Sequence, residues 1–343
     1  MRSTGDIHRM CEHDPCQLII RRHSGARRTG RAPPAGSQEE AGRNLAVEKI
    51  QRILATTDFS PRSVTALQRA AQLAAEHKAE LYLLHVLPTL PFEAIKRLMV
   101  ETLPEAEHRL YEQAGVALQR EAQALANCGI SVRHHVAIGR AHTEINRYAE
   151  SHHVDLIVIG DQGETFVQEL FLGTTASKTL RRGHRPLLIT KQEPKGPYKH
   201  ALVPVDFSQP SLDALNVALK VAPQASVHVL HAVPAPFDQG RKHAGFYEEW
   251  VDLHRDKMLN RALEEMEKIV EDHVRDHTPP VIPVIEHGLP SAIIREKARS
   301  LDIDLIIIGK RGETELDEAL LGSVTKHVLY ENACDVLVVS PKR

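Results

Sequence analysis

Cysteines, aromatic residues and long apolar runs are all scarce in this chain of 343 residues. The four cysteines (Cys11, Cys16, Cys128 and Cys334) show no regular spacing, which argues against a disulfide framework and fits a reducing compartment. No apolar run reaches the roughly 20 residues that cross a bilayer, and the N-terminus lacks the apolar core of a signal peptide. The formal net charge of −2 gives no reason to expect a polyanion as partner. We therefore expect a cytoplasmic protein with neither a membrane nor a nucleic acid as partner.

Residues 1–44 differ from the rest of the chain, because they contain eight arginines and no lysine and show no apolar periodicity. This composition predicts a disordered N-terminal extension. The residues His8, Cys11, His13 and Cys16 are of types that bind zinc, but their spacing is not that of a standard zinc finger. We predict no metal site there.

The remaining sequence repeats itself once. "ILATTDFSPRSVTAL" from Ile53 is matched by "ALVPVDFSQPSLDAL" from Ala201, and "DLIVIGDQG" from Asp155 is matched by "DLIIIGKRG" from Asp304. The offset between the copies is 148 from Asp58 to Asp206 and 149 from Gly160 to Gly309. Two copies of about one domain's length indicate a duplication, with the polar, proline-containing segment 191–200 as linker.

Each copy alternates short apolar runs with segments of helical periodicity, which predicts an α/β fold with a doubly wound parallel sheet. In the first copy, Ser60 followed by Pro61 is typical of a helix start. A long helix is expected at about 105–126, and "DLIVI" at 155–159 reads as a strand covered on both faces. The methionines Met258 and Met266 are predicted to lie in the core.

A glycine pattern follows this buried strand in both copies: G-x-x-G, nine residues, then glycine and a hydroxyl. Gly160 and Gly309 stand directly after the strand, where ligands bind in open α/β sheets. The later pairs, Gly173-Thr174 and Gly322-Ser323, stand where the last helix should begin, and a helix N-terminus attracts anions. The pattern predicts a loop whose two ends meet at one phosphate group. The alternative is that these glycines serve only turns and helix caps.

Together with "DFS" at the end of the first strand, this interval resembles the universal stress protein family, over residues 48–343 and as two tandem copies. The resemblance implies Rossmann-like domains of five strands each, at residues 45–193 and 194–343. It also implies dimerisation through the last strand and a bound nucleotide, ATP with or without Mg²⁺, at the strand tips. It assigns to the ligand Thr56, Asp58, Val86, Ile159, Gly160, Gly163, Gly173, Thr174 and Thr175 in the first copy. In the second copy it assigns Pro204, Asp206, Ala232, Ile308, Gly309, Gly312, Gly322, Ser323 and Val324.

The sequence leaves three classes of function open. We favour a nucleotide-binding stress sensor or regulator that is not an enzyme. The main alternative is an ATPase or an adenylate-using enzyme with slow turnover, although the sequence has no P-loop lysine and no nucleophile set against a base. The third class is an interaction module without nucleotide. His85 and His231, at the ends of the second strands, are interpreted as sheet residues and not as catalysts.

Two further expectations concern the relation between the copies. The last strands, "PLLIT" and "DVLVVS", are apolar edges that favour pairing of the copies within one chain as a pseudo-dimer, with a further homodimer left open. The first glycine pair encloses Lys310 and Arg311 in the second copy, but Asp161 and Gln162 in the first. If these side chains face the phosphates, the second site should bind a triphosphate about tenfold more tightly than the first.

Overall fold

The computed structural model describes residues 49–89, 103–163, 172–233, 246–273, 279–311 and 321–340. For 103–107, 246–256, 270 and 272–273 it describes the backbone alone. The predicted disorder of 1–44, the His8–Cys16 cluster and Gly312 lie outside these residues.

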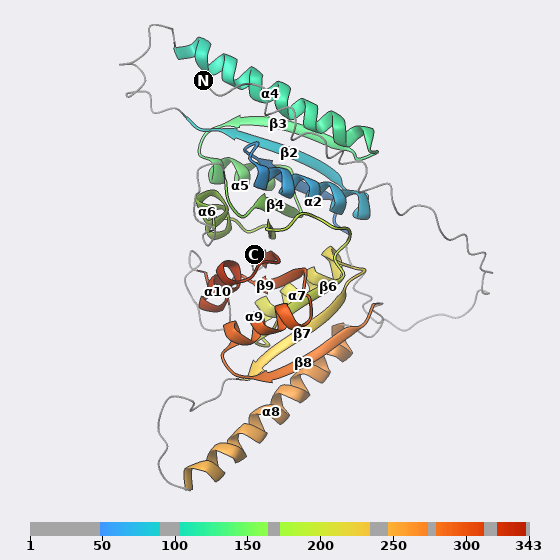
Figure 1. The fold of residues 1–343 in the computed structure, drawn as a ribbon, viewed down its shortest axis with the longest axis vertical. Coiled ribbons are helices and arrows are strands. Elements are labelled where there is room, and N and C mark those ends of the chain that lie inside the picture. Colours follow the sequence, from blue (N-terminus) through green and yellow to red (C-terminus); the bar gives the residue numbers. More distant parts are fainter. Residues whose placement is uncertain are drawn as a thin grey trace, which may run out of the picture.

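Both copies consist of alternating strands and helices (Figure 1). The first copy contains β1 (Arg52–Thr57), α2 (Pro61–His77), β2 (Glu80–Leu87), α4 (Leu103–Asn127), β3 (Val132–Ile138), α5 (Ala141–Ser151), β4 (Leu156–Gly160), α6 (Thr174–Arg182) and β5 (Leu187–Thr190). The second contains β6 (His200–Pro204), α7 (Gln209–Val221), β7 (Ser226–Val233), α8 (Phe246–His273), β8 (Val281–His287), α9 (Pro290–Ser300), β9 (Leu305–Gly309), α10 (Ser323–Glu331) and β10 (Asp335–Val339). The predicted α/β fold, with five strands in each copy, is confirmed.

The strands form one ten-stranded sheet in the order β3-β2-β1-β4-β5-β10-β9-β6-β7-β8. Within each copy all neighbouring strands are parallel, as the βα alternation predicts. Among the described strands, only β5 and β10 pair in antiparallel fashion, with Leu188 opposite Leu337. The last strand of each copy therefore lies at the centre of the sheet, and β3 and β8 form its two edges.

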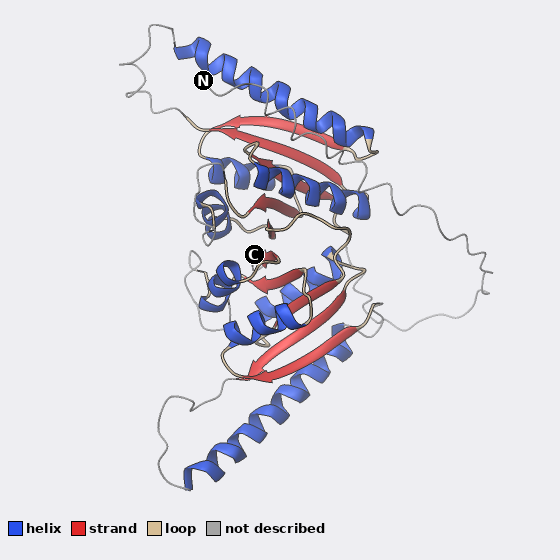
Figure 2. Ribbon diagram, in the orientation of Figure 1, coloured by secondary structure: helices blue, strands red, loops and turns tan. Residues whose placement is uncertain are grey.

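Helices cover both faces of the sheet (Figure 2). Alternate strand residues face opposite sides, so Ile53 and Ala55 contribute to one hydrophobic core and Leu54 to the other. Helices α2, α4, α7 and α8 contribute to the first core, and α5, α6, α9 and α10 to the second. Because each core has residues from both copies, burial of apolar surface continues across the β5–β10 junction.

Local sequence signals explain the main helices. Ser60 is the N-cap of α2, and its hydroxyl accepts a hydrogen bond from the Ser63 amide at 3.3 Å. The helix expected at 105–126 is present as α4. Met266 is buried as predicted, but the core assignment of Met258 is wrong, because that residue is 38% exposed near the start of the described side chains of α8.

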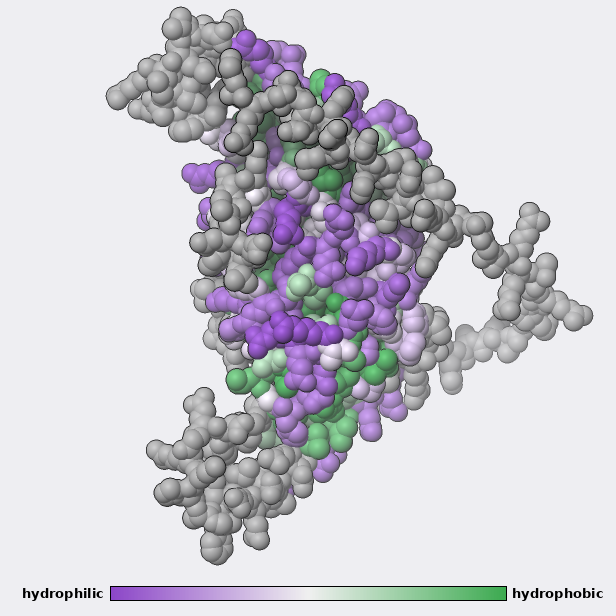
Figure 3. Space-filling model, viewed as in Figure 1, coloured by the Kyte–Doolittle hydropathy of each residue, from purple (hydrophilic) through white to green (hydrophobic). Residues whose placement is uncertain are grey.

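The surface seen in Figure 3 is mainly hydrophilic over the first copy and the middle of the molecule, while hydrophobic residues gather in the lower half. Exposed apolar side chains of the second copy include Ile282, Leu289 and Tyr330. No helix in the described part of the chain combines the length and the apolar character needed to cross a membrane.

Candidate functional site

The turn after the first strand of each copy has an unusual backbone. Phe59 and Phe207 adopt positive φ angles of 63° and 65°, a region that bulky residues rarely occupy. In the first copy, Oδ1 of Asp58 accepts hydrogen bonds from the amide and the hydroxyl of Ser60, at 3.1 and 2.5 Å. Asp206 makes the same two contacts with Ser208. The repeated "DFS" thus builds a tight turn that holds one carboxylate oxygen against the helix start.

A histidine supports this turn from the second strand. His85 Nδ1 lies 2.8 Å from the carbonyl oxygen of Thr57, and the rings of His85 and Phe59 lie 4.6 Å apart. His231 lies 2.8 Å from the carbonyl oxygen of Val205, with its ring 4.2 Å from that of Phe207. These contacts agree with the interpretation of both histidines as sheet residues near the turn. The phenylalanines were not identified from the sequence, although their repetition in "DFS" was a signal.

The two ends of the glycine loop meet in both copies. The amide of Gly173 donates to the carbonyl oxygen of Asp161 at 2.6 Å, and the amide of Gly322 donates to that of Lys310 at 3.1 Å. A Cβ on Gly173 would lie 3.4 Å from Cα of Gln162, so the start of α6 lies against the first glycine turn. The predicted return of the loop to its starting point is therefore present, with residues 164–171 and 312–320 outside the described part.

The glycines at the start of each loop allow close approaches to three different parts of the protein. A Cβ on Gly163 would lie 2.7 Å from Oδ2 of Asp58, so this glycine allows the aspartate and the loop to approach each other. A Cβ on Gly160 would lie 2.9 Å from the Arg62 carbonyl oxygen, and one on Gly309 would lie 3.1 Å from that of Pro210. Gly160 and Gly309 thus also permit close packing of the strand end against α2 and α7.

The last helices begin without side-chain caps. Gly173 precedes α6 and Gly322 precedes α10, and neither helix has a side-chain hydrogen bond at its N-cap. The first-turn amides of a helix need partners from outside it, and they carry a partial positive charge. Thr174 and Ser323 are exposed at these helix starts, and Thr175 and Val324 are half-buried beside them.

Six of the predicted ligand residues lie on one face of the sheet, towards its carboxyl end. Thr56 follows Leu54 by two positions in β1, and Ile159 follows Ile157 in β4, so both lie on the face that α5 and α6 cover. Val86 packs against the same core from β2. The equivalent positions of the second copy are Pro204, Ala232 and Ile308. In each copy, therefore, mainly apolar predicted ligand residues lie on one face of the sheet, at the strand ends from which the glycine turn also starts.

The expected role of Lys310 is wrong. Its side chain is 2% exposed, and Nζ donates to the carbonyl oxygens of Arg181 at 2.9 Å and Gly183 at 3.4 Å, at the end of α6 in the other copy. The carboxylate at the equivalent position, Asp161, lies 3.7 Å from Nε of Arg62. Burial raises the pKa of Asp161, partly offset by Arg62 and Lys191. The side-chain charges of Lys310 and Asp161 are therefore directed into the protein and not at the glycine turns, while the expected role of Arg311 stays a prediction.

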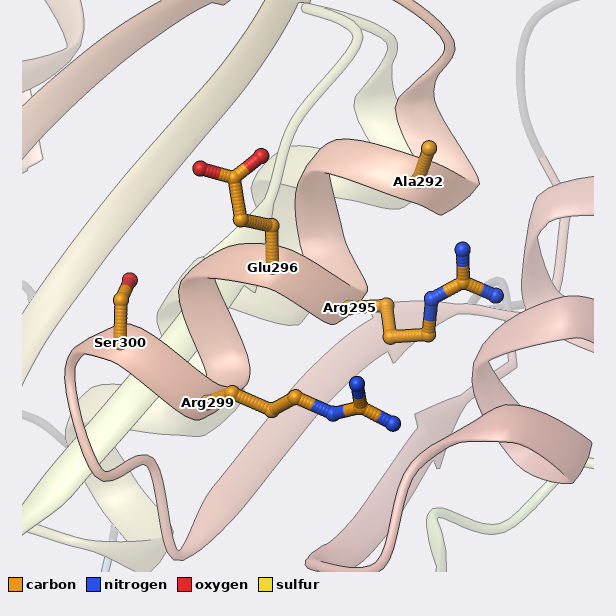
Figure 4. A pocket seen from close by; sticks show the side chains of 5 residues that line it. All are labelled: Ala292, Arg295, Glu296, Arg299 and Ser300. Atoms are coloured by element: carbon orange, nitrogen blue, oxygen red, sulfur yellow. The ribbon is translucent and has the colours of Figure 1, made fainter.

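Surface hollows lie at the "DFS" turn of the second copy and on α9. One, of about 380 Å³, is lined by Asp206, Phe207, His231, Val233, Met258, Arg261, Ala262 and Glu265. The other, of about 530 Å³, lies on α9, where Arg295 and Arg299 extend in the same direction (Figure 4). Arg295 is paired with Glu331 of α10 at 2.7 Å. This second hollow has lining residues from a single helix, so it does not combine the features of the strand tips.

The comparisons with known proteins agree with the duplicated architecture. The universal stress protein family matches the chain twice, at residues 49–191 and 197–340. The chain belongs to the universal stress protein family.

Among the described residues, no group of three or more His, Cys, Asp or Glu side chains is placed to hold a metal ion.

The curated relatives of similar length are also universal stress proteins. The universal stress protein E homolog of Haemophilus influenzae is 26% identical over 317 residues, which cover 86% of this chain and 99% of the relative. A universal stress protein of Mycobacterium tuberculosis is 28% identical over 313 residues, covering 83% of this chain and 94% of the relative.

Solved structures share the fold over both copies. A universal stress protein from Archaeoglobus fulgidus is 20% identical, with a TM-score of 0.59, over 84% of this chain and 98% of that one. A functionally unknown protein from Pseudomonas aeruginosa is 21% identical, also with a TM-score of 0.59, over 86% of this chain and 94% of that one. At this level of identity the likeness concerns the fold alone.

Proposed function

We propose that this stress protein is a cytoplasmic nucleotide-binding sensor or regulator and not an enzyme. It binds ATP, with or without Mg²⁺, at the strand tips of its two domains, residues 45–193 and 194–343. The observation that carries this proposal is the duplicated closure of the glycine loop. In both copies an uncapped helix N-terminus lies against the turn that follows the buried strand.

The residues present fit such a ligand. Amides at a helix start bind phosphate oxygens through hydrogen bonds and the partial charge of the helix. Gly163 and Gly173 let the loop approach Asp58 and the first glycine turn closely, and without side chains they leave their backbone open to phosphate oxygens. The apolar residues Val86 and Ile159 supply a surface for the base.

The carboxylates Asp58 and Asp206 suit the sugar end of the nucleotide. A carboxylate accepts hydrogen bonds from ribose hydroxyls, whereas it repels phosphates unless a divalent cation lies between them. The "DFS" turn fixes each carboxylate through Oδ1, and Oδ2 of Asp58 lies against Gly163, so the proposed sugar contact is next to the proposed phosphate-binding turn. Conformation-dependent partner binding then provides the regulatory output, with the copies paired through β5 and β10 as a pseudo-dimer.

The direct test is to denature freshly purified protein and identify any released nucleotide, and then to measure ATP affinity and turnover. Bound nucleotide with negligible turnover supports a sensor. Multiple turnover supports an ATPase instead, and the absence of nucleotide both before and after addition of ATP supports an interaction module.

A substitution at Gly322 tests nucleotide binding separately from folding. At Gly322 an added Cβ meets only ordinary contacts, at 3.5 Å from Arg311 Cα, so the folded state should survive substitution. Gly322→Val should abolish nucleotide binding in the second copy, because the larger side chain blocks the helix N-terminus. The measurement is calorimetric titration in a background where Gly173→Val disables the first copy, with circular dichroism as the check on folding. Undiminished affinity of the second copy contradicts the proposal.

A further inference from the structure

A buried carboxylate lies at the junction of the two copies. Asp335 begins β10, and its side chain is 1% exposed. Its Oδ1 accepts hydrogen bonds from the amides of Lys191 at 2.8 Å and Gln192 at 3.2 Å, while its Oδ2 accepts one from the Tyr198 hydroxyl at 2.7 Å. All three donors belong to the segment that links the copies.

The counter-charge comes from the other copy. Arg69 of α2 has a side chain that is 6% exposed, and its Nε lies 3.3 Å from Oδ2 of Asp335. The guanidinium group lies 4.1 Å from the centre of the Tyr198 ring, and Nη1 donates to the carbonyl oxygen of Gly196 at 3.0 Å. Burial raises the pKa of Tyr198 well above its usual range and Asp335 raises it further, so the phenol stays a donor. A cation of the first copy and an anion of the second thus form a buried ion pair.

The internal repeat has no such pair at the equivalent place on the other side of the junction. By the offsets of 148 and 149 between the copies, Arg69 corresponds to Val217 and Asp335 to Pro186. Tyr198 corresponds to Ile50. The junction therefore has a charged side and an apolar side, although the backbones of its two halves repeat each other.

This asymmetry decides which faces can pair. Two first copies brought together would place each Arg69 against Pro186, and two second copies would place each Asp335 against Val217. Either arrangement leaves buried charges without a counter-charge, which is strongly unfavourable even though an intact buried pair adds little net stability. We propose that the last-strand face of each copy is specific for the other copy and excludes its own kind, and that the Arg69–Asp335 pair is the main determinant.

Each copy also extends one lysine across the junction, half-buried Lys191 from the first and buried Lys310 from the second. Lys191 donates to the carbonyl oxygens of Leu329 and Asn332, both at 2.6 Å, at the end of α10. Lys310 makes the reciprocal contact with the end of α6. Cations stabilise helix C-termini. Their repeat equivalents are Ser340, whose hydroxyl also reaches the Gly183 carbonyl oxygen, and Asp161. Every pairing of the copies therefore supplies each helix end with one lysine, so these contacts hold the junction together without selecting the partner.

The experiment uses the full chain with a protease site inserted after Glu193, an exposed residue of the linker. The folded protein is cut, denatured, refolded at micromolar concentration and analysed by native mass spectrometry. The expected product is the pair of unlike halves, in at least tenfold excess over both pairs of like halves. A statistical 1:2:1 mixture, or halves that remain separate after refolding, overturns the proposal.

Variants assign the effect to the charged pair. In the cut protein, Arg69→Met combined with Asp335→Leu should raise the pairs of like halves towards the statistical ratio. Arg120→Met is the matched control, because this arginine is exposed on α4, which packs on β2 and β3 at the edge of the sheet, and it should leave the tenfold excess unchanged. In the uncut chain each single change should lower the urea midpoint more than the double change does. An unchanged excess in the double variant, with its fold intact, shows that the pair does not set the specificity.

Discussion

At the scale of single residues, the contact between Gly163 and Asp58 leaves no room for a methyl group. A Cβ on Gly163 would lie 2.7 Å from Oδ2 of Asp58, closer than real Cβ contacts. Gly163→Ala should therefore move the carboxylate and reduce the nucleotide affinity of the first copy at least tenfold, about 1.4 kcal/mol. Titration calorimetry with the second copy disabled by Gly322→Val measures this. An affinity within a factor of two of the parent contradicts the expectation.

A second residue-scale prediction concerns alkaline pH. Burial raises the pKa of the Cys334 thiol to about 12, from an ordinary value of 9.0. Because the unfolded chain then loses this proton first, Cys334 favours folding less and less from pH 9 upwards. The contribution falls by about 1.4 kcal/mol for each pH unit up to pH 12. Comparison of urea unfolding between the parent and Cys334→Ala at pH 8 and pH 10.5 isolates this effect. Parallel pH profiles for the two proteins would refute it.

At the scale of elements, α4 contains a glycine that its surroundings do not require. Gly115 lies in the helix interior, and a Cβ there would meet nothing within 4 Å. Glycine in a helix costs about 0.5–1 kcal/mol relative to alanine. Gly115→Ala should stabilise the protein by that amount while leaving nucleotide affinity unchanged, which makes it the control for Gly163→Ala. Denaturant unfolding provides the value, and a lowered midpoint would show an unseen close contact.

The elements were also the part of the structure that the sequence predicted best. Ser60 with Pro61, and the apolar periodicity after them, sufficed to place α2, because capping and helical spacing are local properties. The glycine interval sufficed to predict that the loop ends meet. The direction of Lys310 could not be predicted, because a side chain just beyond a strand can turn to either side. Here, packing against α6 of the other copy decides its direction. The Arg69–Asp335 contact could not be predicted either, because it also depends on how the two copies pack against each other.

At the scale of the whole molecule, Lys310 links the glycine turn of one copy to a helix of the other. Lys310→Met would leave the carbonyl oxygens of Arg181 and Gly183 without this buried donor, at a cost of about 1–3 kcal/mol. Nucleotide affinity of the second copy should stay within about threefold of the parent, because the ammonium group points away from the site. Unfolding and titration of the same variant measure both quantities. A tenfold loss of affinity at unchanged stability would restore the original electrostatic hypothesis.

The central position of β5 and β10 has a consequence for synthesis of the chain. Strand β10 is the last strand described, and it follows β5 by roughly 145 residues. At about 5–20 residues per second, the ribosome completes the first copy some 7–30 seconds before its partner strand exists. During that interval the edge of β5 lacks its partner strand, and Arg69 lacks its counter-charge Asp335. The brevity of β5, at four residues, limits how much unpaired backbone a nascent chain presents to its neighbours.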